Sequence, residues 1–270
     1  MTEQFFTNRV ALITGASSGI GRATALRLAA AGAKLGLAAR NGAALQEVAD
    51  QAAEAGAALP IPTDVTEPEQ CRRAVEATVE RFGKLDLLIC SAGLSMRAYF
   101  EGSALPALER VMRVNFFGTL YATHFALPHV KRSRGSLVAI SSVTGLRGIP
   151  SYGVYGASKF AIQGLYESLH LELKKHGVHV GVVSPAFVDT PLRDNVLAGD
   201  GQPWHVPPPP PFRIWPVEKC VDRIVRLIVK RRREIVLPWF VGPMLALDRL
   251  LGYGFGNWLL ERKFPEESPP

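Results

Sequence analysis

The chain has 270 residues, 47% of them hydrophobic, and its basic residues outnumber its acidic ones by seven. A length and apolar content of this kind suit one large α/β domain with an ample core. The positive charge is not arranged as arginine stripes interleaved with aromatic residues, which excludes nucleic acid as an expected partner.

Strand-like and helix-like segments alternate along most of the chain. Apolar, strand-like runs lie near residues 9–14, 34–39, 85–90, 135–141 and 178–184. Helical stretches separate them, for example at residues 43–55, 67–82 and 153–175. This alternation predicts an α/β fold with a doubly wound parallel sheet of the Rossmann type, flanked by helices.

The first predicted strand runs into a glycine-rich turn, Thr14-Gly-Ala-Ser-Ser-Gly-Ile-Gly21, which opens an Ala/Leu-rich helix ending near Ala31. Glycines in such a turn let the backbone approach a pyrophosphate, and the first helical N–H groups supply partial positive charge to bind it. A turn with no ligand is disfavoured, because the strand and the helix that this motif requires are both present. The predicted dinucleotide contacts are Gly15, Ser17, Ser18, Gly19, Ile20 and Gly21.

The second strand-like run ends at Ala39, where an acidic residue would favour NAD and an arginine NADP. Arg40 and Asn41 stand there. A guanidinium can hold a 2′-phosphate through charge-assisted hydrogen bonds, whereas a carboxylate would repel it. We therefore expect NADP(H), with Arg40 and Asn41 at the adenosine ribose. The alternative is that Arg40 is a solvated residue at the start of a helix.

Tyr155 and Lys159 lie four residues apart, so a helix would place them on one face. A neighbouring cation lowers the pKa of a phenol, which would let Tyr155 give or take a proton. Neither Tyr152 nor Tyr166 is followed by a lysine at that spacing. Tyrosine and lysine are ordinary helix-surface residues, so the pair gains its meaning from the glycine turn and from Ser142 upstream.

Together these motifs resemble the short-chain dehydrogenase/reductase family in its single-domain form, over about residues 8–237. The resemblance implies that Ser142 orients the carbonyl or hydroxyl group of the substrate and that Tyr155 is the general acid/base. It implies that Lys159 contacts the nicotinamide ribose and keeps the pKa of the tyrosine low. It also implies that Asn115 helps to hold a water that links the lysine to solvent.

The same resemblance places the remaining cofactor contacts at Asp64, Val65, Ser91, Ala92, Gly93, Tyr155, Lys159, Pro185, Val188 and Thr190. Two positions depart from the family pattern. Ser91 stands where the family has an asparagine that ties neighbouring strands together, and it can still make one hydrogen bond. Ala186 stands where the family has glycine after proline. Ser141 is expected to be structural, because alternate strand residues face opposite ways.

Residues 190–216 include five consecutive prolines and the aromatic residues Trp204, Phe212 and Trp215, a composition that disfavours a regular helix. The resemblance implies that this segment covers the substrate, and its aromatic residues suggest a bulky, apolar one. Two alternatives are a stiff connector without substrate contact and aromatic residues that anchor the loop to the core.

The C-terminal part begins with a predicted helix over 217–230, three arginines and a short strand over 234–237. We expect one NAD(P)-binding domain over residues 1–237 and an apolar extension over 238–270. The thirteen uncharged residues from Ile235 to Leu247 are too few to span a bilayer. The extension is loosely similar to the tails of the 11β-hydroxysteroid dehydrogenase-like branch, some of which act on lipophilic substrates. Burial in a subunit interface, which we favour, or peripheral membrane contact would explain its apolar surface.

Cys71, Cys90 and Cys220 lie far apart, which argues against a disulfide framework and favours a reducing cytoplasm. The first residues carry an acid early and lack a long apolar run, so no secretory signal is predicted. His176 and His179 flank a turn without a cysteine or carboxylate cluster nearby, so we predict no metal site.

The sequence thus predicts an NADP(H)-dependent reductase, or the reverse dehydrogenase, that interconverts a carbonyl and a secondary alcohol on a hydrophobic small molecule such as a steroid, a lipid or a similar ketone. The resemblance implies a homodimer or homotetramer. The alternative is a cofactor-binding regulatory or scaffold protein without turnover, against which the intact Ser142, Tyr155 and Lys159 argue.

Overall fold

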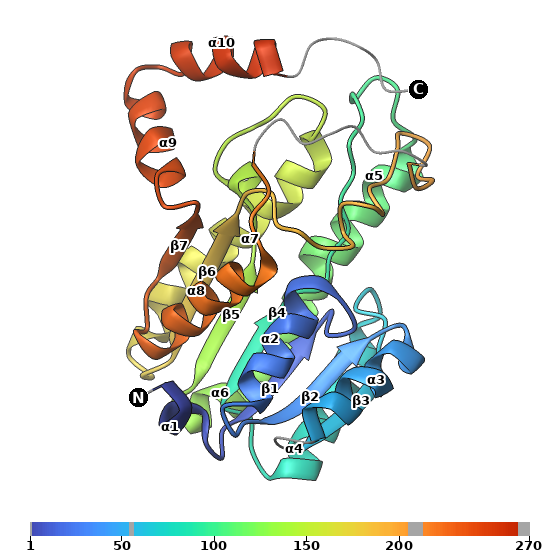
Figure 1. Cartoon of the computed structure of the whole chain (residues 1–270), viewed down its shortest axis with the longest axis vertical. Helices are drawn as coiled ribbons and strands as arrows, with labels where there is room; N and C mark the ends of the chain where they lie inside the picture. The colour runs from blue at the N-terminus through green and yellow to red at the C-terminus, as the bar shows by residue number, and fades with distance from the viewer. Residues whose placement is uncertain (1, 54–56, 205–212, 264–270) are drawn as a thin grey trace.

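A seven-stranded, all-parallel sheet forms the centre of the molecule in the computed structural model, which describes residues 2–53, 57–204 and 213–263 (Figure 1). The strand order is β3-β2-β1-β4-β5-β6-β7. The strands are β1 (Val10–Thr14), β2 (Lys34–Ala39), β3 (Ala58–Pro62), β4 (Leu87–Cys90), β5 (Ser136–Ile140), β6 (His179–Pro185) and β7 (Glu234–Leu237). The predicted doubly wound parallel sheet is therefore confirmed.

Helices cover both faces of the sheet, which explains why the central strands are apolar along their whole length. One face carries α2 (Gly19–Ala29), α3 (Gly42–Ala53) and α8 (Val217–Val229). The other carries α4 (Pro68–Phe82), α6 (Gly118–Ser133) and α7 (Gly153–Lys174). Shorter segments are α1 (Thr2–Phe6), α5 (Leu105–Met112), the π-helix η1 (Arg113–Phe117) and the 3-10 turn η2 (Val143–Gly145). Two apolar cores result, one on each side of a single-domain sheet.

The edge strand β3 is absent from the sequence-based prediction. Its sequence, Ala-Leu-Pro-Ile-Pro, contains two prolines, which lack the N–H that a central strand needs. The strand pairs only with β2, so the prolines stand at the edge of the sheet, where this is tolerated.

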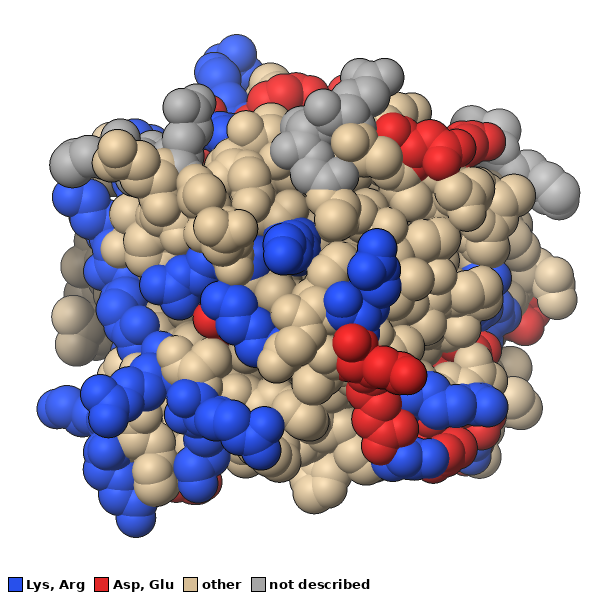
Figure 2. All heavy atoms as spheres, turned by 90° about the horizontal axis from the view of Figure 1, so that it is seen from below, with Lys and Arg blue, Asp and Glu red and all other residues tan. Residues whose placement is uncertain are grey.

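The strand order reverses at β1, whose two neighbours are β2 and β4. The loops that follow β1 and β4 diverge to opposite faces, which opens a crevice at the carboxyl ends of these strands. The amino ends lie at the other side of the molecule, and there Figure 2 shows many Lys and Arg side chains gathered on the face seen from below. Arg9 and Arg231 belong to this end, where burial and the charge of Arg9 lower the pKa of Arg231. Part of the net positive charge therefore lies away from the crevice.

Two helices follow the last strand, α9 (Val241–Leu250) and α10 (Gly254–Lys263), and they rise beyond the carboxyl edge of the sheet (Figure 1). Arg147, in the loop after β5, holds them there. Its Nε is 3.2 Å from a carboxylate oxygen of buried Asp248, its guanidinium lies 4.5 Å from the ring centre of Tyr253, and it donates a hydrogen bond to Asn257. Many apolar side chains of this extension stay exposed, Leu250 at 84%. Among the described residues, none of the helices has the length and apolarity needed to cross a membrane.

Candidate active site

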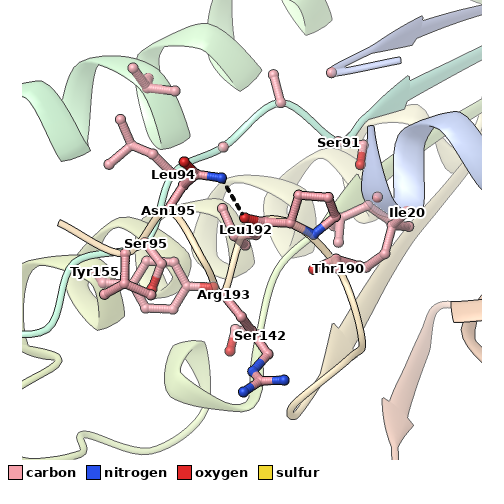
Figure 3. Close-up of a pocket in the computed structure, with 18 of the residues that line it drawn as sticks. Ile20, Ser91, Leu94, Ser95, Ser142, Tyr155, Thr190, Leu192, Arg193 and Asn195 are labelled. Atoms are coloured by element: carbon pink, nitrogen blue, oxygen red, sulfur yellow. Dashed lines mark hydrogen bonds between the residues drawn. The ribbon is translucent and has the colours of Figure 1, made fainter. Parts of the chain in front are cut away.

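A cleft of about 540 Å³ opens at the carboxyl edge of the sheet, where the sequence predicts the dinucleotide (Figure 3). Its walls come from the loops after β1, β2, β3, β4, β5 and β6. All the predicted cofactor contacts line it except Gly21, and of the predicted catalytic residues only Asn115 does not. The structure thus brings together residues that are spread over most of the chain.

The glycine turn is shaped by two close approaches. Gly15 has φ +69°, and a Cβ there would lie 2.7 Å from the backbone of Ala92 in the loop after β4. A Cβ on Gly21 would lie 2.2 Å from the carbonyl oxygen of Gly15, so Gly21 serves the packing of helix on turn and does not reach the cleft. Ser18, the N-cap residue of α2, makes no side-chain cap hydrogen bond. The first N–H groups of α2 therefore fit an anionic pyrophosphate.

The adenosine end of the cleft contains Arg40, Asn41, Asp64 and Val65. Arg40 is exposed. Asn41 Oδ1 accepts a hydrogen bond from the Ala44 N–H at 3.1 Å, so this side chain starts α3 as well as lining the cleft. Asp64 Oδ1 accepts hydrogen bonds from the N–H and the hydroxyl of the residue two positions on, at 2.9 and 2.8 Å. These two side chains are thus held in fixed orientations.

Ser142, Tyr155 and Lys159 converge at the other end of the cleft. Ser142 follows β5, and its hydroxyl accepts a hydrogen bond from the Thr144 N–H at 3.2 Å. Tyr155 and Lys159 lie in the first turns of α7, and Lys159 Nζ is 5.7 Å from the centre of the Tyr155 ring. The Lys159 ammonium donates a hydrogen bond to the Ile140 carbonyl at 3.0 Å. The predicted one-faced arrangement of the tyrosine and the lysine is present.

The pKa values of Tyr155 and Lys159 differ from the sequence-based expectation of a lowered tyrosine pKa. Burial raises the pKa of Tyr155 to about 12, and a hydrogen bond with Ser142 opposes that shift. Burial also lowers the pKa of Lys159 to about 8. The pKa of Tyr155 is thus raised and not lowered in the protein alone, because desolvation of the phenol outweighs its hydrogen bond with Ser142.

Asn115 lies fully buried in η1, and it ties two parts of the site together. Its side-chain amide exchanges hydrogen bonds with both backbone groups of Leu94, at 2.8 and 3.0 Å, and donates to Ser158 Oγ at 3.0 Å. Ser158 in turn donates to the Tyr155 carbonyl at 2.7 Å. The loop after β4 and the start of α7 are therefore fixed to one another through Asn115. The water predicted at this residue stays a prediction.

Thr14 joins two strands next to the departure at Ser91. The Thr14 hydroxyl accepts hydrogen bonds from the N–H groups of Ser91 and Ala92, at 3.2 and 3.3 Å, which joins the ends of β1 and β4. Ser141 has the structural role expected of it, because its hydroxyl donates to the Lys159 carbonyl at 3.1 Å.

The segment after β6 forms one wall of the cleft. A Cβ on Gly19 would lie 3.2 Å from the Cβ of Thr190, so this wall meets the glycine turn, as Figure 3 shows. Trp204 and Trp215 do not line the cleft, and their backbone N–H groups donate to the carbonyls of Val196 and Phe187. Phe212 and the prolines before it lie outside the described residues.

Several lining residues escaped the sequence-based prediction. They include the apolar Leu94, Ile149 and Leu192 and the basic Arg97 and Arg193. Arg193 follows Thr190 by three residues, and Leu94 directly follows the predicted contact Gly93. Their closeness in sequence to predicted cofactor contacts indicates that they lie near the cleft. No spacing rule links residues that reach the cleft from separate loops.

The crevice at the switch point, with a serine, a tyrosine and a lysine at one end, defines a dinucleotide-dependent α/β oxidoreductase.

The chain belongs to the short-chain dehydrogenase/reductase family, because the family model described as short chain dehydrogenase matches residues 9–201. It is 38% identical over 245 residues to 11-beta-hydroxysteroid dehydrogenase-like 4A of Arabidopsis thaliana, which covers 90% of this chain and 80% of the relative. It is 34% identical over 253 residues to 11-beta-hydroxysteroid dehydrogenase A of Arachis hypogaea, covering 90% and 72%.

Solved structures agree with this assignment. A short-chain dehydrogenase/reductase from Burkholderia phymatum in complex with NAD superposes with a TM-score of 0.81 at 28% identity, over 92% of this chain and 96% of that one. An alcohol dehydrogenase from Thermococcus sibiricus complexed with 5-hydroxy-NADP gives 0.73 at 26% identity, over 85% and 95%. Family and fold therefore establish an oxidoreductase that uses a nicotinamide cofactor.

Proposed function

We propose that this protein is an NADP(H)-dependent oxidoreductase that interconverts a carbonyl and a secondary alcohol on a hydrophobic small molecule. The observation that carries the proposal is the convergence of Ser142, Tyr155 and Lys159 at one end of a cleft that is also lined by a glycine turn with uncapped helical N–H groups. A scaffold protein without turnover would not need the three polar groups at that place.

In the reducing direction, the hydroxyl groups of Ser142 and Tyr155 donate hydrogen bonds to the carbonyl oxygen of the substrate. The cofactor, when bound, supplies the hydride that reaches the carbonyl carbon. Tyr155 then gives its proton to the developing alkoxide. The raised pKa keeps the phenol protonated at neutral pH, which suits a general acid. In the oxidising direction each step reverses, and Lys159 binds the nicotinamide ribose and offers its charge to the phenolate that then forms.

The preference for NADP(H) rests on Arg40. It lines the adenosine end of the cleft and is exposed there, so its guanidinium is free to turn toward a 2′-phosphate. No lining carboxylate follows β2 directly, where one would repel that phosphate. The relatives in known structures carry either NAD or an NADP derivative, so the choice for this chain depends on its own residues.

The hydrophobic substrate is supported by the apolar residues around the reacting end, among them Leu94, Val143, Ile149 and Leu192. Names of relatives point in the same direction, since several are called 11-beta-hydroxysteroid dehydrogenases. A steroid ketone, a lipid ketone or a similar molecule fits this lining.

Oxidation of NADPH by the purified protein across a panel of steroid ketones, 3-oxo lipids, quinones and aldehydes tests the proposal. Tyr155→Phe should lower turnover by about 100- to 10,000-fold, the usual loss on removing a general acid. Tyr121→Phe removes a phenol on α6 that does not line the cleft, and it should keep full activity. Turnover within a few-fold of the wild type in Tyr155→Phe would refute the assignment. Tight NADPH binding without any turnover would favour the scaffold alternative.

We further propose a division into a catalytic domain over residues 1–237 and an extension over 238–270. The exposed Trp239 and Leu250 support burial of the extension between subunits of a homo-oligomer, with contact to a membrane interface as the alternative. Sedimentation of the wild type and of a Leu250→Ser variant, with and without lipid vesicles, distinguishes the two. A smaller particle for the variant supports the subunit interface, whereas loss of vesicle binding alone supports the membrane.

A further inference from the structure

Ser95, in the loop after β4, presents a hydroxyl group to the cleft that the mechanism above does not use. The residue lines the cleft and is only 7% exposed. Among the described residues, its hydroxyl has no hydrogen-bond partner. Thr144 also has a buried hydroxyl without a partner, but that oxygen is closed to solvent, whereas the Ser95 hydroxyl keeps accessible surface. A molecule in the cleft can therefore reach the hydroxyl of Ser95.

The backbone around Ser95 is held on both sides. The Ser95 carbonyl accepts a hydrogen bond from the Leu197 N–H at 2.9 Å, and the Leu197 carbonyl accepts one from the Arg97 N–H at 2.9 Å. The side chain of buried Asn115 binds both backbone groups of Leu94, at 2.8 and 3.0 Å. The hydroxyl is thus carried on a fixed backbone, so little conformational entropy is lost when a ligand binds it.

The same contacts keep Ser95 at the reacting end of the cleft. The residues on either side of it, Leu94 and Met96, pack in one apolar cluster with Tyr155. The asparagine that holds Leu94 donates to Ser158, which donates to the Tyr155 carbonyl at 2.7 Å. Figure 3 shows the Ser95 side chain close to the Tyr155 ring. The protein therefore sets the separation between this hydroxyl and the catalytic phenol.

We propose that Ser95 is a substrate-binding residue, and that the substrate is a hydrophobic ketone, or the matching alcohol, that carries a second hydroxyl group placed to reach Ser95. A purely apolar body would expel water from the Ser95 hydroxyl and leave it without a partner, which costs free energy. A substrate hydroxyl at that place restores the hydrogen bond, and each of the two hydroxyl groups can donate or accept. Such a site discriminates against an analogue that lacks the group. This assignment rests on the proposed function, because it concerns the substrate of the same site.

Calorimetric titration of the NADP⁺-loaded protein tests the assignment without requiring turnover. The probes are pairs of cyclic ketones: one member carries a tertiary hydroxyl, which NADP⁺ cannot oxidise, and the other carries hydrogen at that position. The hydroxyl stands at increasing distance from the carbonyl along the series. At the fitting distance the hydroxy ketone should bind about 3- to 10-fold more tightly than its partner, the scale of one neutral hydrogen bond. Ser95→Ala should abolish this preference and leave the affinity for the partner nearly unchanged. Ser168→Ala, at an exposed serine of α7 outside the cleft, should keep the preference.

Equal affinity for both members of every pair in the wild type would overturn the assignment, since water would then satisfy Ser95 as well as a substrate does. A preference that persists in Ser95→Ala would overturn it too. Turnover separates this proposal from the preceding one. Reduction of both members of every pair with equal kcat/KM would keep the reductase and overturn the role of Ser95. Binding that prefers the hydroxy ketone and depends on Ser95, without reduction of any probe, would support that role and count against the reductase.

Discussion

Lys159 gives the free energy of unfolding a dependence on pH that can be calculated from the structure. Burial lowers its pKa from 10.5 to about 8. Between these two values the unfolded chain keeps a proton on Lys159 that the folded chain has lost, so stability rises with pH across this window. Each unit of pKa shift is worth about 1.4 kcal/mol, so the free energy of unfolding gains about 3 kcal/mol from pH 8 to pH 10.5. Below pH 8 the contribution of Lys159 does not change with pH.

The comparison that isolates this term is between the wild type and Lys159→Met, in the absence of cofactor. Buried cysteines and tyrosines titrate in the same range with the opposite sign, because burial raises their pKa values. Those that do not interact with Lys159 cancel in the difference, whereas Cys90 does not cancel fully, because the charge of Lys159 lowers its pKa. Urea denaturation followed by circular dichroism should show the stability difference moving in favour of the wild type by about 3 kcal/mol between pH 8 and pH 10.5. A difference that stays constant across this range would refute the reasoning, since Lys159 would then titrate alike in both states.

Three further predictions concern the cofactor site, the glycine turn and the extension. Arg40→Asp should weaken NADPH binding by about 10- to 100-fold, the loss of one or two charged hydrogen bonds, and equal Kd values by fluorescence titration would remove Arg40 from the cofactor site. Gly15→Ala should lower stability by about 2–4 kcal/mol in urea denaturation, because its Cβ would meet backbone at 2.7 Å, whereas Gly83→Ala, also at positive φ but in open space, should lose less. Asp248→Leu deprives Arg147 of its carboxylate and should speed amide hydrogen exchange in α9 and α10 by about 10- to 100-fold, with unchanged exchange contradicting the anchoring role.

The sheet and the cofactor crevice could be predicted because their signals are local. Buried parallel strands are continuous apolar runs, and the glycine turn, the strand before it and the helix after it are contiguous in sequence. The third strand was missed because Pro60 and Pro62 disfavour strand, and only its position at the sheet edge allows them. Local pattern carries no information on where a strand lies in the order of a sheet.

The chemistry of the site was predictable in its residues and not in its electrostatics. The spacing of Tyr155 and Lys159 predicts that their side chains meet, and they do. The sign of the tyrosine pKa shift depends on how much of the surrounding protein excludes water, which no spacing reveals. Arg97 and Arg193 come from different loops, and only the folded chain shows that both line the cleft.

The contact of Arg147 with the C-terminal helices makes the loop after β5 and the extension depend on one another in a chimera. Arg147 stands five residues after Ser142, while its partners Asp248, Tyr253 and Asn257 come from the extension. A chimera that takes this extension from a relative keeps the junction only if the donor tail offers a carboxylate and an aromatic ring to the arginine. Recombination between relatives should therefore succeed when the loop after β5 and the extension are transferred together, and fail to order the tail when either is moved alone.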